Sequence, residues 1–363
     1  MTAFFIVSAV GQALAGFLVD RLGAQRVLWA GIALFAVAGV VLGLAQSYAY
    51  LLLAAMLAGL GNCVFHPADF TVLNRHVSPK HLCHAFSAHG LSGNFGWAAA
   101  PVCMTLIAAW AGWRVAAFSA AGLALVVLVL LLSRRAAIAD LDGAHEEKSK
   151  ANYAEDTVAS SLFGFLNVSA VWMCFAFFFV LAIAFGVFQS YAPAVLQNMY
   201  GLSLAAGASA LTCYVLGSAG GIVLGGFLAS KNEAHEKLIA LVLFAAALFS
   251  IVLASGWIPA WSVLVVMAII GFFSGIAGPS RDLLVRKAAT ARFGHKSYGR
   301  VYGFVYSGLD IGLAAAPLLF GWLMDASLFG LVLLGVAGMQ CCALLMALKV
   351  GRKVSTSINH KEA

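Results

Sequence analysis

Long apolar runs, each broken by a short polar corner, dominate the chain. Eleven runs approach or exceed ~20 residues, the length that crosses the hydrocarbon core of a bilayer. Because backbone polar groups in lipid must find partners within their own segment, each run is predicted to be a membrane-spanning helix. The runs cover residues 2–19, 27–46, 49–73, 84–109, 112–133, 164–192, 204–229, 237–256, 259–283, 299–322 and 327–349.

The longest polar interruption separates the fifth run from the sixth. Its sequence, RRAAIADLDGAHEEKSKANYAEDTVASS, holds six of the fourteen acidic residues of the chain and lacks helical periodicity. Such a segment is typical of a solvated linker. We therefore predict an N-terminal helical bundle over residues 1–133, a cytoplasmic linker over 134–162, a C-terminal bundle over 163–350 and a cytoplasmic tail over 351–363.

Composition excludes a water-soluble domain and argues against nucleic-acid binding. Hydrophobic residues make up 63% of the chain, charged residues only 10%, and the mean hydropathy is +0.97. A soluble core of this size would need a polar coat that the chain does not have. The net charge of +7 comes from bases in short corners, without a basic patch interleaved with aromatic residues, so we predict a lipid bilayer and not a nucleic acid as its partner.

The distribution of lysine and arginine predicts the orientation in the membrane. If the corners after the first, third, fifth, seventh and ninth runs and the C-terminal tail face the cytoplasm, they collect 19 of the 21 basic residues. The exceptions are Arg114 and Arg281. This asymmetry follows the positive-inside rule, so we expect a multi-pass protein of a bacterial-type inner (plasma) membrane, with the C-terminus cytoplasmic and Met1 outside.

Two pairs of segments show that the chain contains an internal repeat. GQALAGFLVDR at residues 11–21 aligns with GIVLGGFLASK at 221–231, and GWAAAP at 96–101 aligns with GLAAAP at 312–317. Small residues four positions apart allow two helices to approach closely in lipid. A duplicated helical bundle joined by a polar linker is typical of secondary transporters.

The first of these segments carries a family resemblance. GFLVDRLGAQRVL at residues 16–28 resembles the corner motif GxLxDRxGRRxxL of the major facilitator superfamily, with Gly16, Asp20, Arg21 and Gly23 in place. The resemblance implies an all-α membrane protein with the two-bundle fold of that family. It also implies that these four residues form a conformational gate at the corner between the family's second and third helices.

The number of spans departs from the family pattern. Only one run precedes the corner, whereas the family has two, so the first of its twelve helices is expected to be missing from this chain of about 11 spans. One explanation of the missing helix is that the start codon has been assigned too late or the gene is truncated. The other is a genuine eleven-span protein. In the family the first helix lines the substrate path, which leaves open whether this chain is active alone.

Two further segments resemble a subgroup of the superfamily, the fosmidomycin-resistance-type exporters. These are GNCVFHPADF at residues 61–70 and SGNFGWAAAP at 92–101. Drug/proton antiporters of the superfamily often carry an arginine four residues before a glycine on the fourth helix. Here Ala55 precedes Gly59 at that spacing, so the usual arginine-based proton relay is not predicted.

A polar stripe in the third run is a candidate for proton coupling or for the substrate path. Asn62, His66 and Asp69 step by four and three residues, which places them on one helical face, and Pro67 between the last two loosens the backbone. Titratable groups in lipid are costly unless they face a cavity or a partner. The alternative is that Asp69 simply marks the cytoplasmic end of the helix.

Further polar residues lie in later runs. Asp310 is about eleven residues into its helix, near the middle of the membrane, and is either a proton or substrate site or a neutral carboxyl bonded to a neighbouring helix. The adjacent Arg281 and Asp282 are interpreted as a structural gate pair, although an arginine could also hold an anionic solute. His89 and Asn94 either line the path or pack between helices.

No motif points to catalysis. HExxH, GxSxG and P-loop patterns are missing, and no histidine and acid cluster has metal-ligand spacing, so no catalytic residue, cofactor or metal is predicted. The sequence favours a monomeric secondary transporter that moves a small organic solute by alternating access. Proton-coupled export of a drug-like or anionic compound is the preferred reading. Proton-coupled uptake of a metabolite and a non-transporting receptor or scaffold are the alternatives.

Overall fold

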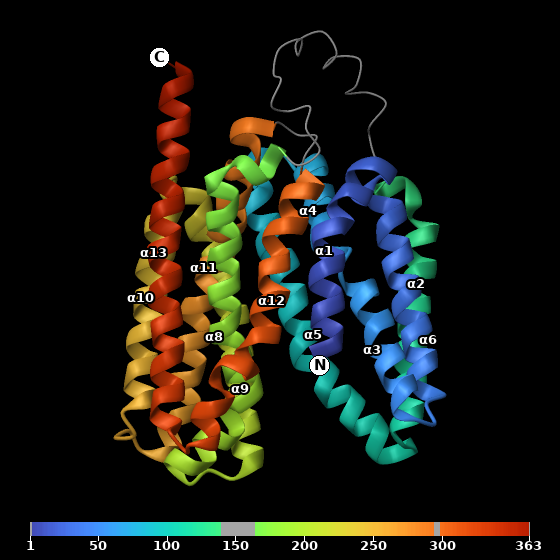
Figure 1. Ribbon diagram of the computed structural model, residues 1–363, viewed down its shortest axis with the longest axis vertical. Helices are drawn as coiled ribbons and strands as arrows, with labels where there is room; N and C mark the ends of the chain where they lie inside the picture. The colour runs from blue at the N-terminus through green and yellow to red at the C-terminus, as the bar shows by residue number, and fades with distance from the viewer. Residues whose placement is uncertain (1, 139–163, 294–297, 363) are drawn as a thin grey trace.

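The computed structural model describes residues 2–138, 164–293 and 298–362, and within these ranges all regular elements are helices. Eleven helical segments in the described part of the chain are long and apolar enough to cross a membrane. They follow the order of the eleven apolar runs, so the prediction of an all-α membrane bundle with about 11 spans is confirmed (Figure 1).

The first half of the chain forms one group of helices, drawn blue to teal in Figure 1. Its predicted third span is divided into two helices, and short 3₁₀ turns cover Pro79–His81 and Arg135–Ile138. The helices are α1 (Thr2–Leu22), α2 (Ala24–Gly43), α3 (Tyr48–Asn62), α4 (Phe65–His76), α5 (Leu82–Ala111) and α6 (Trp113–Ser133).

The second half forms the other group, drawn green to red. Its helices are α8 (Ser169–Tyr200), α9 (Leu204–Lys231), α10 (His235–Ala254), α11 (Val263–Phe293), α12 (Tyr298–Asp325) and α13 (Phe329–Glu362), with 3₁₀ turns at Gly164–Asn167 and Ala260–Ser262. Most of the predicted linker, residues 139–162, lies outside the described residues. Helix α13 continues through the predicted tail as far as Glu362.

The break between α3 and α4 has a local cause. Pro67 is the third residue of α4 and has no N–H to donate to the carbonyl of Cys63, and its ring would collide with that carbonyl in a continuous helix. The chain therefore turns at Cys63 and Val64, and helical bonding resumes with Ala68 N–H donating to the Val64 carbonyl at 3.0 Å. A proline in the first turn of a helix is well tolerated.

The halves meet most extensively where α1 packs on α12 and α5 on α9, and they also meet where α4 contacts α12 and α5 contacts α11. A side chain on Gly16 would overlap the backbone of Gly299, and one on Gly226 would overlap Ser87. Gly16 and Gly226 occupy matching positions in the internal repeat, as expected for a duplicated bundle. The small residues predicted to allow close helix packing therefore lie where the two halves meet.

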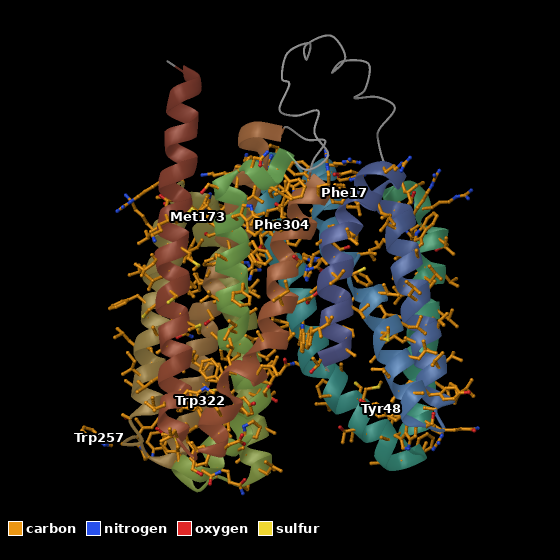
Figure 2. All side chains as sticks on the ribbon, viewed as in Figure 1. Phe17, Tyr48, Met173, Trp257, Phe304 and Trp322 are labelled. Carbon is orange, nitrogen blue, oxygen red and sulfur yellow. The ribbon has the colours of Figure 1, made fainter. Side chains whose placement is uncertain are left out.

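The two ends of the bundle differ. At the end where α1 finishes and α12 begins, here called the Asp20 end, the rings of Phe17, Phe165 and Phe304 form a chain with centroids 6.1 and 5.8 Å apart (Figure 2). Tyr48 and Trp257 lie toward the opposite end and are highly exposed. Amphipathic aromatic rings on the outside of a bundle are typical of the membrane–water interface.

Candidate functional site

A hydrogen-bonded chain across the two halves holds Asp310. The Ser8 hydroxyl on α1 donates to Asp310 Oδ2 on α12 at 2.6 Å, and Asn62 Nδ2 at the end of α3 donates to Ser8 Oγ at 2.9 Å. Asp310 is only 2% exposed, and no ion pair to it occurs among the described residues. Two predicted site residues, Asp310 and Asn62, are thus brought together through a serine between them.

A second cluster lies one helical turn along α12, toward the Asp20 end. The His66 ring stacks on the Tyr306 ring with centroids 4.3 Å apart, and the Tyr306 hydroxyl donates to Asp282 Oδ1 at 2.6 Å. Arg281 Nε donates to the same oxygen at 2.9 Å, while its guanidinium lies 4.7 Å from the centre of the Phe178 ring. Helices α4, α8, α11 and α12 therefore meet around one buried carboxylate.

Asp69 and His89 form the third polar contact of this region. His89 Nε2 on α5 lies 3.8 Å from Asp69 Oδ2 on α4, and these side chains keep 31% and 22% of their surface exposed. Asn94, one turn further along α5, donates to the Gly90 carbonyl of its own helix at 3.0 Å. The stripe of Asn62, His66 and Asp69 thus contacts three different helices, α1, α12 and α5.

The polar contacts continue along α12 toward the Asp20 end. Tyr302 donates to the Asp282 backbone carbonyl at 3.2 Å and accepts from Asn74 Nδ2 at 3.3 Å, while its ring stacks on Phe70 with centroids 4.8 Å apart. Together with Tyr306 and Asp310, it places a polar group on one face of α12 at nearly every turn. This face is directed at the first half of the chain.

The corner residue Asp20 closes the far end of the same interface. Its carboxylate accepts from the backbone N–H of Gly299 and of Arg300 at 3.0 and 3.2 Å, and from Arg300 Nε at 2.9 Å. An acid of the first half thereby satisfies the free N–H groups at the start of α12, where the helix dipole favours negative charge. Arg21 is exposed, and Gly23 makes the turn with a positive φ of 86°.

An apolar pocket lies between the halves at the end opposite Asp20. It has a volume of about 320 Å³ and is lined by Phe4 and Phe5 of α1, Ala55 of α3, Trp97 of α5 and Gln189 of α8. The Trp97 ring also meets the Phe185 ring of α8 edge-on, with centroids 5.9 Å apart. The pocket is therefore bounded by both halves and carries one carboxamide on an otherwise apolar wall.

Comparison with known proteins decides the family. Residues 1–292 match the Major Facilitator Superfamily. The chain belongs to this superfamily. The predicted resemblance to the fosmidomycin-resistance-type subgroup is also confirmed: the fosmidomycin resistance protein of Escherichia coli is 26% identical over 318 residues, which is 87% of this chain and 75% of that protein.

A second relative of this major facilitator chain matches a shorter stretch. The probable 4-methylmuconolactone transporter of Cupriavidus pinatubonensis is 36% identical over 133 residues, which cover 36% of this chain and 31% of that protein. Among solved structures, the Escherichia coli fucose:proton symporter superposes with a TM-score of 0.75 at 15% identity, over 96% of this chain and 89% of that one. A human organic anion transporter gives 0.74 at 14% identity, over 95% and 82%. These likenesses establish the fold.

Three residues of the site were not predicted from the sequence. Ser8 and Tyr306 lie inside apolar runs, where hydroxyl groups are common and gain meaning only from their partners on other helices. Gln12, one turn from Ser8, is fully buried against α12, yet both its side-chain polar atoms are without hydrogen-bond partners among the described residues. Its position one turn before Gly16 in the repeated segment could have singled it out.

Gln12→Leu is expected to stabilise the arrangement in which α1 and α12 are packed. A buried polar group without a partner costs about 1–3 kcal/mol, so its removal should shift the balance toward the packed state by about 5- to 150-fold. Spin-label distances between the corners after α1 and α9 would measure the shift. Gln340→Leu is the control, since Gln340 is equally buried but accepts from Ser250 within the second half; an equal shift there would contradict the expectation.

Proposed function

We propose that the chain is a proton-coupled secondary transporter that exports a small drug-like or anionic compound by alternating access. The observation that carries this proposal is the buried carboxyl of Asp310, which is held across the two halves by Ser8 and has no ion pair within the described part of the chain. Family membership and relatives named as transporters support carriage of a solute rather than catalysis. We further propose a monomer of two helical bundles with the boundaries given above.

Alternating access is supported by the unequal ends of the interface. The halves are joined at the Asp20 end by an ion pair and by tightly packed glycines, while the apolar pocket lies between them at the other end. The positive-inside pattern assigns the Asp20 end and the C-terminus to the cytoplasmic side of an inner membrane. In that orientation the structure corresponds to a carrier closed toward the cytoplasm.

Proton coupling is assigned to Asp310 on physical grounds. A carboxyl buried at mid-depth without a basic partner is costly to ionise, whereas its neutral form is easily accommodated by hydrogen bonds. The Ser8 hydroxyl can donate to Asp310 in either form, and Asn62 orients that hydroxyl. Loss or gain of one proton would therefore change how strongly α12 is held against α1.

Flux into proteoliposomes tests the proposal against its alternatives. The full chain, reconstituted in one orientation, should move a labelled organic anion such as benzoate against its gradient when a pH gradient is imposed. Outward pumping in exchange for protons supports export, and accumulation together with protons supports the runner-up, uptake of a metabolite. No flux of any of a panel of organic anions and neutral drugs, under either gradient, would favour the non-transporting receptor.

His66→Ala is expected to shift the pH optimum of transport rather than remove solute binding. His66 stacks on Tyr306, whose hydroxyl donates to Asp282, so a proton on His66 would alter the charge of this cluster. Flux measured from about pH 5 to about pH 8 should show a displaced maximum, with binding changed by no more than about tenfold. An unchanged pH profile would assign His66 to packing alone.

A further inference from the structure

Among the described residues, no charged side chain lines the apolar pocket between the halves. Of the helices that form it, α3 and α8 contain neither a charged residue nor a histidine. On α5 only His84 and His89 can carry a charge, and both precede Trp97 by more than two turns. On α1 only Asp20 and Arg21 are charged, and they lie at the opposite end of the helix. An ionised ligand in the pocket would lose its water without gaining a counter-charge, so the pocket favours an uncharged solute.

Aromatic rings form most of the pocket wall. Phe4 and Phe5 meet edge-on with their ring centroids 5.0 Å apart, and Trp97 meets Phe185 in the same way at 5.9 Å. The Trp97 side chain is half exposed, so its contact with Phe185 leaves part of the indole uncovered. Faces and edges of fixed rings favour contact with another ring, and a volume of about 320 Å³ lies in the range of small-molecule sites. The pocket therefore suits a solute that itself contains a ring.

The carboxamide of Gln189 is the polar group that this wall offers to a ligand. The residue is half-buried, and its side chain makes no hydrogen bond within the described part of the chain. Neighbouring polar side chains are already used, because Tyr191 donates to the Pro317 carbonyl at 2.9 Å and Asn94 donates to the Gly90 carbonyl at 3.0 Å. A carboxamide both donates and accepts, so it matches an amide or another carbonyl group of an uncharged solute.

The pocket adjoins the buried carboxyl of Asp310. Phe4 and Phe5 lie one helical turn before Ser8, whose hydroxyl donates to Asp310. Phe5 also belongs to the same buried apolar cluster as Leu313, which lies one turn after Asp310 on α12. One turn of helix rises about 5.4 Å. A solute against Phe5 would therefore lie beside the contact between α1 and α12 that protonation of Asp310 is proposed to change.

We propose that the apolar pocket binds the transported solute, and that this solute is an uncharged compound with a ring and a carbonyl or amide group directed at Gln189. This rests on the proposed function and narrows its substrate class from drug-like or anionic compounds to uncharged ones. The rings of Phe4, Phe5 and Trp97 supply affinity by burying apolar surface, and Gln189 orients the solute. Ala55 keeps the space open, since a larger side chain there would extend into it.

The test is equilibrium binding to the purified full chain in lipid nanodiscs, without any need for transport. Radiolabelled naphthamide is the probe, and its binding to empty nanodiscs is subtracted because an apolar compound also enters lipid. Naphthoate and ethylnaphthalene are the competitors, since they keep the ring system and replace the amide by a charged or a hydrocarbon group. Near pH 8, where naphthoate is ionised, it should compete about tenfold or more weakly than unlabelled naphthamide. Ethylnaphthalene should compete about 2- to 12-fold more weakly, because it lacks the hydrogen bond.

Variants locate the bound probe. Gln189→Leu should weaken naphthamide by about 2- to 12-fold and leave competition by ethylnaphthalene within about twofold of its wild-type value. Ala55→Phe should abolish the binding of both, because the added ring fills the pocket. Met56→Phe is the matched control: it places the same ring on the next residue of α3, which is exposed and does not line the pocket, and should change nothing. The comparison of the three ligands on the wild type does not depend on how well any variant folds.

The outcomes separate this inference from the function on which it rests. No saturable binding of naphthamide, equal competition by naphthoate, or binding that survives in Ala55→Phe would each overturn the site, whatever the flux assays show. Equal competition by ethylnaphthalene that Gln189→Leu does not alter would also overturn it, since a pocket for a lipid tail would behave in that way. Naphthamide binding that is lost in Ala55→Phe, but without naphthamide flux under any gradient, would support the site and contradict the transport proposal. Flux of benzoate driven by a pH gradient, without naphthamide binding, would do the reverse.

Discussion

Asp310→Asn should abolish accumulation driven by a pH gradient while energy-independent exchange of solute continues. Asparagine has the same shape and can still accept from the Ser8 hydroxyl, so the contact between α1 and α12 is preserved. It cannot release or bind a proton. One coupled proton crossing a gradient of one pH unit supplies about 1.4 kcal/mol, which corresponds to a tenfold accumulation, and the variant should fall to equal concentrations on both sides.

The measurement compares net accumulation with counterflow in the same proteoliposomes. Asp325→Asn is a matched control, because it makes the same change in the same helix at an exposed position away from the interface. If Asp310→Asn accumulates solute normally at every pH tested, the acid has a structural role. The coupling group would then have to be sought elsewhere, with Asp69 the first candidate.

Hydrophobicity alone predicted the number and order of the spans, because lipid imposes one simple requirement on every segment. The ends of the helices were less predictable. Helix α11 was expected to finish near residue 283 but continues to Phe293, through the polar sequence RDLLVRKAATARF. A helix can continue beyond the hydrocarbon core of the membrane. Hydropathy marks only the part of the helix that lies within that core.

Internal symmetry predicted the contacts between the halves better than any single motif did. Gly16 and Gly226 could be paired from the aligned segments, and both lie at inter-half contacts. The grouping of Arg281 with His66 could not be foreseen. The two residues lie in different apolar runs, and only the packing of α4 against α12 brings them together through Tyr306. Residues that contact each other across the two halves are far apart in the sequence, so no motif spacing reveals the contact.

The corner acid was predicted from its motif, but its mode of action depends on the structure. Asp20 does not pair with the bases of its own corner in the contacts described above. It binds the start of α12 in the other half, through two backbone N–H groups and Arg300. An acid placed in this way stabilises only the state in which the Asp20 end is closed, because separation of α1 from α12 breaks all three hydrogen bonds at once.

Asp20→Asn is therefore expected to shift the carrier away from the closed state and to slow transport, while solute binding stays within a few-fold of wild type. The amide carries no charge to match Arg300, and its NH₂ group cannot accept from backbone N–H groups. Loss of such contacts typically costs about 1–3 kcal/mol, equivalent to a 5- to 150-fold change in the ratio of states. Spin-label distances between the corners after α1 and α9 would report the ratio directly.

The matched control is Glu233→Gln, an exposed acid at the corresponding corner of the second half, which should leave the distances unchanged. Binding of the transported solute, measured on the same samples, separates the gate from the transport path, since Asp20 lies at the end of the interface and Asp310 further inside. Loss of binding in correctly folded Asp20→Asn would show that the two are not independent. Unchanged distances together with slow transport would place the effect of Asp20 on the rate of the transition instead of on the balance of states.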